Sequence, residues 1–451
     1  MNAKTTLRKR IIHSVSWVMS GHIFSQILRL GSNLIMTRLL VPEMFGIMAI
    51  ANVIMLGLFM MSDMGVHQHI IQSKHSDSVK FLNTAWVMSI IKGLVLWGCA
   101  LIICWILIVL SNNNFWLSDS VYADPQLPYI ISVLAFGSVI EGFNSTKLPL
   151  AYRNFALGKV VKIEAIAQIT GLLVMVIWAY IERTIWALVL GALVTISCKT
   201  VLTHTNLPGY NNKLSWDRKS FYELFHFGKW IFLTSTLGFF SMNGDRLVLG
   251  GLIDANLLGI YSIAFFILNA IQRIFSKIIG TVALPTFSEV VRERPHDLNT
   301  TYYKFRLPID GIALVTAGFL FIAGHHFIDI LYDDRYKQAG YMIEILSLML
   351  IAERYYLTEQ CFIALGKPSY LVPMMIPRVL ILFILLPIIY EKYGIYGALW
   401  VIALNRIAEL PILFYFKIKT SLFNIYKEVY FLLFIFIGVC MGLVINKITW
   451  S

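Results

Sequence analysis

Residues 13–54 read HSVSWVMSGHIFSQILRLGSNLIMTRLLVPEMFGIMAIANVI, and our prediction of the fold starts from this stretch. It contains an apolar segment of membrane-spanning length, a short turn around Pro42, and the start of a second apolar segment. On a helix, the polar side chains of the first segment fall within about 60° of one another. They are His22, Gln26, Arg29 and Asn33. A cation near the middle of a membrane needs water or an anion to face.

The same stretch occurs a second time, 213 residues later. Ten of the 42 aligned positions are identical, and the identities begin with His13 and His226 and include Trp17 and Trp230. A second match lies further along, where the tetrapeptide ALGK at 156–159 recurs at 364–367. Two matches at nearly the same offset predict that the chain consists of duplicated halves.

The composition places the chain in a membrane. Of 451 residues, 58% are hydrophobic and 14% charged, and the mean hydropathy is +0.72. Apolar stretches of about twenty residues recur throughout, which predicts an all-α, polytopic membrane protein. The first stretch lacks a small-residue cleavage pattern, so we interpret it as a retained helix. The five cysteines form no CxxC pair, and we expect no disulfide, metal or cofactor.

Thirteen spans are predicted, six in each half and one more at the end. They cover residues 14–37, 45–66, 82–110, 127–147, 161–181, 184–203, 222–249, 258–283, 308–331, 338–362, 369–390, 395–416 and 428–446. Because six spans return the chain to its starting side, the halves are expected to be parallel repeats. The predicted domains are an N-terminal six-helix lobe (1–203), a cytoplasmic linker (204–221), a C-terminal six-helix lobe (222–417) and an additional transmembrane helix (418–451).

Lysine and arginine are unevenly distributed between the two predicted sides. With a cytoplasmic N-terminus, 22 of the 37 basic residues fall in inner segments and 6 in outer segments, and 9 lie within spans. This bias predicts that orientation. It also explains the net charge of +12, because the basic residues would lie beside the anionic headgroups of the lipids. We therefore expect no nucleic-acid partner.

Among the basic residues within spans, Arg29 and Arg273 are the most informative. Asn269 and Arg273 share a helix face, so the second half repeats the polar stripe of the first. One interpretation is that both stripes face a cavity between the halves, and the other is that neighbouring helices neutralise each arginine. Arg378 follows Pro377, whose expected kink could turn the arginine towards a cavity.

Other charged residues within spans allow two interpretations. Arg354 beside Glu353, and Arg406 three residues before Glu409, suit buried ion pairs or ligand contacts equally, whereas Asp245 and Arg246 are expected to pair with each other. Three carboxylates either carry a coupling ion or, as we favour, neutralise the arginines; they are Glu141, Glu164 and Glu344. The spacing of His325, His326 and Asp329 could suit a metal, but we favour a site without one.

Basic groups with amide and aromatic neighbours indicate an anionic, hydroxyl-rich ligand, and the planar fork of arginine suits phosphate. At these residues the chain resembles a known family. The motifs are RLLVPEMFGIMAIANVI with Asp63-Met64-Gly65, NGDRLVLGGLIDANLLGIYSIAFFI, ALGKPSYLVPMM and YGIYGALW. They are similar to those of Wzx-type oligosaccharide flippases of the polysaccharide transporter family, whose superfamily also contains MATE exporters and lipid II flippases.

The resemblance extends to about residue 417 and implies two six-helix lobes, a central cationic cavity and alternating access. It implies a flippase that moves undecaprenyl-pyrophosphate-linked oligosaccharide across the cytoplasmic membrane of a bacterium, among membrane lipids, with H⁺ or Na⁺ as candidate coupling ions. Arg29, Arg273 and Arg378 would hold the pyrophosphate. Gln26, Asn33 and Asn269 would complete the substrate site, and Glu141, Glu164 and Glu344 are the ion-coupling candidates.

Two other functions compete with this one. A MATE-like cation-coupled exporter would need an acidic cavity, which the excess of basic residues disfavours. A membrane polymerase would need a large outer catalytic loop or acidic outer-loop motifs, and the first outer loop is only RLLVPEM. We therefore expect a transporter and not an enzyme.

Overall fold

The computed structural model describes residues 3–62, 66–67, 70, 78–154 and 156–449, with side chains for most of them. The chain is helical, and the described residues contain no strand. The Asp63-Met64-Gly65 motif and the side chains of His13, His226 and Trp230 lie outside the described part. The chain separates into two compact units, Met1–Phe239 and Phe240–Ser451.

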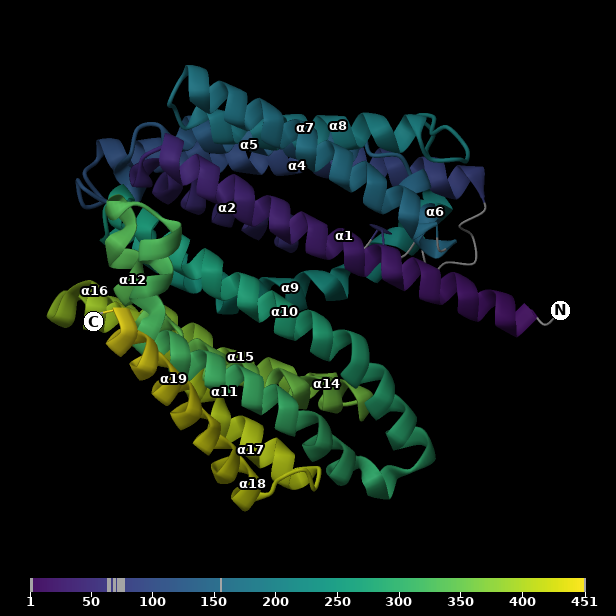
Figure 1. The fold of residues 1–451 in the computed structure, drawn as a ribbon. Helices are drawn as coiled ribbons and strands as arrows, with labels where there is room; N and C mark the ends of the chain where they lie inside the picture. Colours follow the sequence, from purple (N-terminus) through teal and green to yellow (C-terminus); the bar gives the residue numbers. More distant parts are fainter. Residues whose placement is uncertain (1–2, 63–65, 68–69, 71–77, 155, 450–451) are drawn as a thin grey trace. The chain divides into compact units, whose positions relative to one another are not determined.

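Unit 1 consists of long helices joined by short segments (Figure 1). Its elements are α1 (Ala3–Leu39), α2 (Pro42–Met61), α4 (Val79–Asn112), η1 (Val121–Ala123), α5 (Leu127–Gly142), α6 (Lys147–Arg153), α7 (Leu157–Ile181), α8 (Trp186–Thr205) and the first part of α9 (Arg218–Leu252). Pro42 at the first turn of α2 supports the helix start there, because its fixed φ suits that position.

Two helix pairs organise unit 1, α4 with α5 and α7 with α8. Glycines allow the backbones of α4 and α5 to approach closely. A Cβ atom added to Gly142 would lie 2.7 Å from the carbonyl oxygen of Ser89, and one added to Gly93 would overlap that of Ser138. Small residues at the contact are the usual means of bringing membrane helices together. This pair forms one wall of the cavity described below.

Unit 2 contains more interrupted helices. Its elements are the rest of α9, then α10 (Ala255–Glu293), η2 (Pro295–Asp297), α11 (Leu298–Leu331), η3 (Asp334–Tyr336), α12 (Lys337–Leu346), α13 (Met349–Glu353), α14 (Tyr356–Ala364), η4 (Pro368–Tyr370), α15 (Leu371–Leu380), η5 (Ile381–Leu385), α16 (Leu386–Leu404), η6 (Asn405–Glu409), α17 (Leu410–Lys419), α18 (Ile425–Tyr430), η7 (Phe431–Leu433) and α19 (Phe434–Thr449).

Several single helices expected from the sequence are broken in unit 2. The predicted span 338–362 is divided among α12, α13 and α14. Pro377 lies inside α15, and the π-helical turn η5 begins four residues later. A π-turn beside a proline relieves the lost helical hydrogen bond and bends the helix. Gly394 adopts φ 62°, which interrupts α16, and glycine has no Cβ to oppose that conformation.

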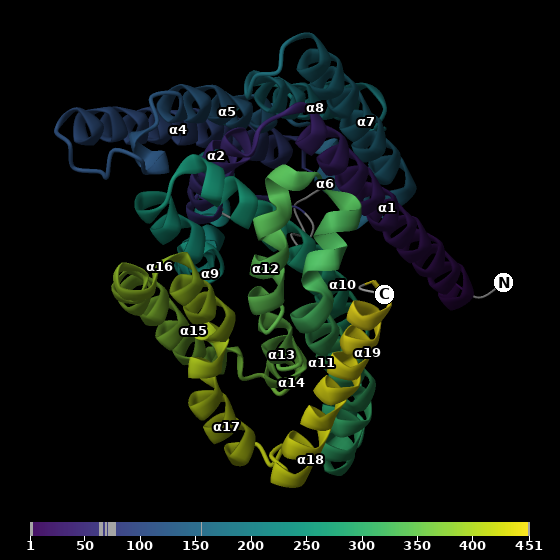
Figure 2. The ribbon, with the colours of Figure 1, turned by 60° about the vertical axis from the view of Figure 1, so that its left-hand side comes forward.

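The last helix is an integral part of unit 2. α19 lies along α11 in Figures 1 and 2. A Cβ atom on Gly438 would overlap the carbonyl oxygen of Val315, and one on Gly318 would overlap that of Ile435. The two backbones therefore touch through glycines from both helices.

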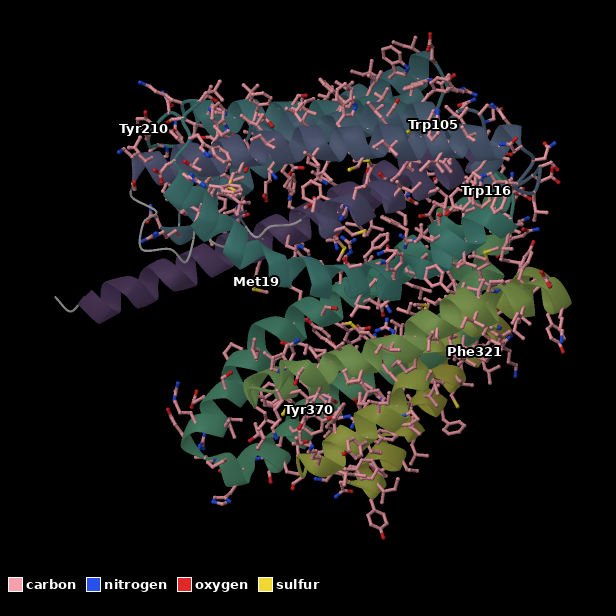
Figure 3. All side chains as sticks on the ribbon, turned by 180° about the vertical axis from the view of Figure 1, so that it is seen from behind. Met19, Trp105, Trp116, Tyr210, Phe321 and Tyr370 are labelled. Atoms are coloured by element: carbon pink, nitrogen blue, oxygen red, sulfur yellow. The ribbon has the colours of Figure 1, made fainter. Side chains whose placement is uncertain are left out.

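Length and apolarity give eight helices in the described residues that could cross a membrane, or nine if the bent α5–α6 pair is one span. One of these segments, Pro368–Lys419, has 52 residues. At about 1.5 Å per residue, the length of this segment is more than twice the thickness of a hydrocarbon core of about 30 Å. It is therefore long enough for two crossings. The arrangement of twelve spans plus one stays a prediction. Large apolar side chains project from the helices, as Trp105 does from α4 (Figure 3), where 65% of its surface is exposed.

Candidate functional site

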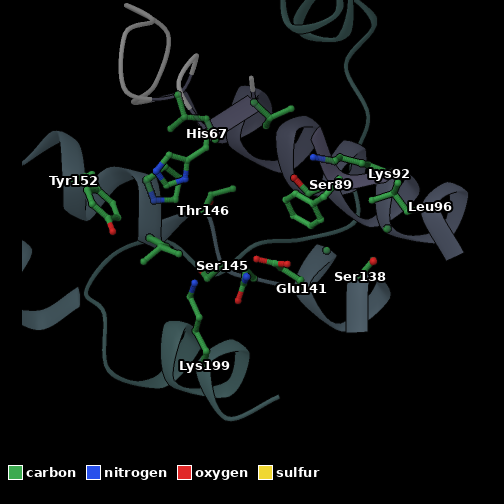
Figure 4. A pocket seen from close by; sticks show the side chains of 18 of the residues that line it. His67, Ser89, Lys92, Leu96, Ser138, Glu141, Ser145, Thr146, Tyr152 and Lys199 are labelled. Atoms are coloured by element: carbon green, nitrogen blue, oxygen red, sulfur yellow. The ribbon is translucent and has the colours of Figure 1, made fainter. Parts of the chain in front are cut away.

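A cavity of about 360 Å³ lies within unit 1, among α2, α4, α5, α6, α7 and α8 (Figure 4). Its wall is mixed, with aliphatic and aromatic side chains beside hydroxyls, amides and charges. The polar side chains that line it are His67, Ser89, Lys92, Ser138, Glu141, Asn144, Ser145, Thr146, Tyr152, Glu164 and Lys199. Small-molecule sites have volumes of about 300–1,000 Å³, so this cavity is large enough for a ligand.

The segment that was expected to be a linker fixes one edge of the cavity. The Asn212 side chain accepts from the Ser145 hydroxyl and the Thr146 backbone N–H, each at 3.1 Å, and donates to the Thr146 hydroxyl at 2.7 Å. Lys147 Nζ donates to the carbonyl oxygen of His204 and to Asn211 Oδ1. The segment that follows α8 is therefore hydrogen-bonded to unit 1 through Asn211 and Asn212, and it holds the 145–146 turn in place.

Three polar side chains in the cavity have no hydrogen bond or ion pair within the described structure: Ser138 and Glu141 of α5, and Lys199 of α8. Figure 4 shows Glu141 and Lys199 on the same side of the cavity. By contrast, Lys92 Nζ lies 4.6 Å from the centre of the Phe59 ring. The carboxylate of Glu141 can accept a hydrogen bond from a ligand in the cavity, and the ammonium group of Lys199 can donate one.

In unit 2, a first cluster of buried charges surrounds Glu428. Its carboxylate accepts from Arg306 and from Lys417, and Tyr355 donates to it at 3.2 Å. Arg306 also pairs with Asp310 at 3.0 Å, and Arg354 lies 3.5 Å from the same carboxylate. Arg306 and Asp310 are fully buried. The cluster joins α11, α17 and α18, which sequence analysis had not connected.

A second cluster centres on Arg406. Its guanidinium lies 2.8 Å from Glu353 and 3.4 Å from both Glu359 and Glu409, and Arg378 lies 3.6 Å from Glu409. Together the two clusters contain five basic and five acidic side chains, so their formal charges cancel. Buried charges are tolerated when they are paired in this way.

The predicted substrate residues lie in both units. In unit 1 the side chain of Arg29 is exposed on α1, and those of Gln26 and Asn33 are half-buried. In unit 2 Arg273 is exposed at the middle of α10, and its Nε donates to Asn269 Oδ1 at 3.3 Å, as their spacing of four predicts.

Arg273 has no acidic partner among the described residues. Arg378 differs, because Glu409 neutralises it and its side chain is only 13% exposed.

The interpretation that we favoured for the three carboxylates is wrong within the described residues, because none of them pairs with an arginine. Glu344 lies 2.5 Å from His325 Nδ1, Glu164 accepts from the Tyr152 hydroxyl at 3.4 Å, and Glu141 has no partner. The carboxylates that neutralise the arginines of the two clusters lie elsewhere along the chain. Glu409 pairs with Arg406, which is one of the two interpretations that the sequence left open. The others are Asp310, Glu353, Glu359 and Glu428.

The expected ion pair between Asp245 and Arg246 is also wrong. Asp245 accepts from the Tyr261 hydroxyl, and the guanidinium of Arg246 lies 4.0 Å from the centre of the Phe265 ring. Consecutive helical residues point about 100° apart, which separates the two side chains. No group of three potential ligands that could hold a metal occurs in the described residues, and His325 is engaged with Glu344.

Comparison with known proteins gives a family and a fold. The model of the polysaccharide biosynthesis protein family matches residues 35–340. The lipopolysaccharide biosynthesis protein WzxC of Escherichia coli (strain K12) is 21% identical over 347 residues, which cover 77% of this chain and 67% of that protein. The amylovoran biosynthesis protein AmsL of Erwinia amylovora is 22% identical over 293 residues, 64% of this chain and 70% of that protein.

Two solved structures share the fold at low sequence identity. The inward closed conformation of the lipid II flippase MurJ superposes with a TM-score of 0.62 at 16% identity, covering 97% of this chain and 99% of that one. An inward-facing multidrug resistance MATE family transporter gives the same TM-score at 14% identity, covering 87% of this chain and 94% of that one. Because the family model matches well over half of the sequence, this chain belongs to the polysaccharide biosynthesis protein family.

Proposed function

We propose that this protein is a flippase that moves lipid-linked oligosaccharide units across the membrane for polysaccharide biosynthesis. The observation that carries the proposal is the environment of Arg273. It lies at the middle of α10, its side chain is exposed, and its described hydrogen bond is to an amide, not to a carboxylate. An intramembrane cation of this kind is costly unless a ligand or water meets it.

The buried clusters of unit 2 make the contrast clear. There, Arg306, Arg354, Arg378 and Arg406 each lie within 4.0 Å of a carboxylate. The same unit neutralises these four arginines with carboxylates and packs Arg246 against the Phe265 ring, whereas Arg273 has neither kind of contact in the described structure. This difference supports a ligand contact for Arg273 over a purely structural role.

Phosphate is the anion that we assign to it. A guanidinium can donate two parallel hydrogen bonds to one phosphate group, and a pyrophosphate carries enough oxygens for more than one such contact. Arg29, exposed on α1 and flanked on its face by Gln26 and Asn33, is the corresponding candidate in unit 1. Arg378 is engaged with Glu409, so we assign it a supporting role at most.

The finer parts of the proposal come from the resemblance. The carrier would be undecaprenyl pyrophosphate, the membrane would be the cytoplasmic membrane of a bacterium, and the N-terminus would lie inside. The mechanism would be alternating access without covalent chemistry, and Glu141, Glu164 and Glu344 stay candidates for coupling to H⁺ or Na⁺. The relatives named for lipopolysaccharide and amylovoran biosynthesis support the polysaccharide context. The shared fold alone does not separate a lipid flippase from a MATE exporter.

The test uses a strain that lacks its own flippase. Such a strain should accumulate lipid-linked units on the inner leaflet, where an impermeant sugar-oxidising reagent cannot reach them. Expression of this chain should restore surface polysaccharide and expose the lipid-linked units to the reagent. Failure to restore either, with the protein present in the membrane at normal amount, would contradict the proposal.

A further inference from the structure

The cavity of unit 1 contains polar groups that the fold leaves unused. Ser138, Glu141 and Lys199 line it and have no hydrogen bond or ion pair within the described residues. Ser138 is buried and the other two are half-buried, and the polar atoms of all three stay accessible from the cavity, where a ligand or water can bind them. By contrast, Ser145 and Thr146 on the same wall are bonded to Asn212. The unpartnered set is therefore grouped on α5 and α8.

The signs of the charges restrict the ligand. A simple anion would be opposed by Glu141 and Glu164, and a simple cation by Lys92 and Lys199. A ligand with many hydroxyl groups suits both the carboxylates and the ammonium groups. A hydroxyl can donate to a carboxylate, and it can accept from an ammonium group or a serine hydroxyl. The wall also supplies apolar and aromatic surface, including the ring of Tyr152 packed edge-on against His67, with centroids 5.3 Å apart.

The position of the cavity fits the early part of a transport cycle. It lies where α2 and α5 end and α7 begins, beside the last turns of α8. In the predicted topology these helix ends all lie on the cytoplasmic side, where the sugars of a lipid-linked unit are assembled before transport. Lys92 and Leu96 extend the wall further into α4, so the cavity reaches from that end into the helical layer.

We propose that this cavity binds one or two sugar residues of the transported unit, separately from the arginines that hold the pyrophosphate. Glu141 accepts hydrogen bonds from sugar hydroxyls, and Lys199 and Ser138 donate to sugar oxygens. The cavity thereby selects the cargo by its sugars, whereas Arg29 and Arg273 accept any unit on the same carrier. This inference rests on the proposed flippase function.

The experiment compares two cargoes in a strain that lacks its own flippase. The two repeat units share the lipid pyrophosphate carrier, differ in their sugars, and are chosen so that the wild-type chain exports both. Glu141→Gln and Lys199→Gln should each reduce export of one unit about tenfold relative to the other, as expected for loss of one charge-assisted hydrogen bond. Arg273→Ala should reduce both units alike.

Matched controls come from the same unit. Glu182→Gln and Lys159→Gln alter exposed side chains that do not line the cavity, so both cargoes should be exported as by the wild type. Because Glu141 and Lys199 have no partner in the described structure, the two test substitutions leave no buried group unpaired. The amount of protein in the membrane should therefore stay unchanged, and it is measured in parallel.

A binding measurement separates recognition from transport. The oligosaccharide released from its lipid and pyrophosphate should raise the melting temperature of the purified wild-type protein, and Glu141→Gln should abolish that shift. An equal loss of both cargoes in Glu141→Gln would instead assign Glu141 to ion coupling and overturn the proposal. Unchanged export of both cargoes would overturn it as well, while the flippase function survives. Absence of export by the wild type would contradict the flippase function itself.

Discussion

Arg306 and Glu428 form a buried ion pair that joins α11 to α18. The pair connects the helical body of unit 2 to the C-terminal segment that lies beyond the predicted six-helix lobe. Lys417 donates to the same carboxylate. One acidic side chain therefore compensates two cations that are both fully buried.

The first prediction concerns this pair. Glu428→Ala should destabilise the protein by about 3–5 kcal/mol, because it removes the carboxylate that Lys417 pairs with and leaves Asp310 alone to compensate Arg306 and Arg354. The midpoint of thermal unfolding in detergent and the amount of protein in the membrane should both fall. Glu391→Ala, at an exposed carboxylate of α16, is the matched control and should change neither. A Glu428→Ala protein with wild-type melting would show that water or another group already neutralises the cluster.

The second prediction concerns the glycine contact between α11 and α19. Gly438→Leu should separate the two helices, because even a Cβ at this position overlaps the backbone of α11. Limited proteolysis should then release the C-terminal segment faster than in the wild type. Gly311→Ala changes a glycine of α11 that has nothing within 4 Å of an added Cβ. It should leave the digestion rate unchanged or lower, since alanine favours the helix by about 1 kcal/mol.

The sequence predicts the fold class and the family because both depend on features that lie along the chain. Apolar stretches indicate membrane helices, and the match between two stretches 213 residues apart indicates a duplication. The sequence does not predict the breaks at α12–α14, because no proline or glycine marks Ser347-Leu348 or Arg354-Tyr355, where they occur. Nor could it pair Arg306 with Glu428, which are 122 residues apart. Similarly, the unpartnered state of Glu141 depends on which helices surround it, and no local pattern encodes that.

The third prediction concerns topology. Reporter fusions after Tyr210 and Asp297 should be cytoplasmic, and fusions near Asn113 and Asp334 should be external. The reason is that lysine and arginine are concentrated in the segments on the same side as Tyr210 and Asp297. The activities of a phosphatase that works outside and a fluorescent protein that works inside provide the two readouts. An external signal at Tyr210 would contradict the parallel arrangement of two sets of six spans.

The fourth prediction concerns access to the polar stripes. Single cysteines at Gln26 and Asn269, in a variant without the native cysteines, should react with a membrane-impermeant thiol reagent. Cysteine at Ile27 should react far less. Ile27 is 63% exposed in the protein alone, and it points about 100° away from Gln26. Lipid should therefore cover it.

Equal protection at all three positions would mean that the stripes are packed against other helices. Equal reactivity would mean that the whole of α1 is in water, and the assignment of a polar face would lose its basis.

We propose that Arg29 and Arg273 bind the pyrophosphate of a lipid-linked oligosaccharide during its transfer. The most direct test reconstitutes the purified protein in vesicles containing that lipid and measures how fast the inner-leaflet pool becomes accessible to an enzyme added outside. We predict transfer by the wild type and by Arg183→Ala, which changes an exposed arginine two residues after the end of α7. We predict loss in Arg29→Ala and in Arg273→Ala, and partial recovery in the lysine variants, because a point charge cannot form the two-oxygen contact. Transfer at the wild-type rate by both alanine variants, at equal protein content, would contradict the claim.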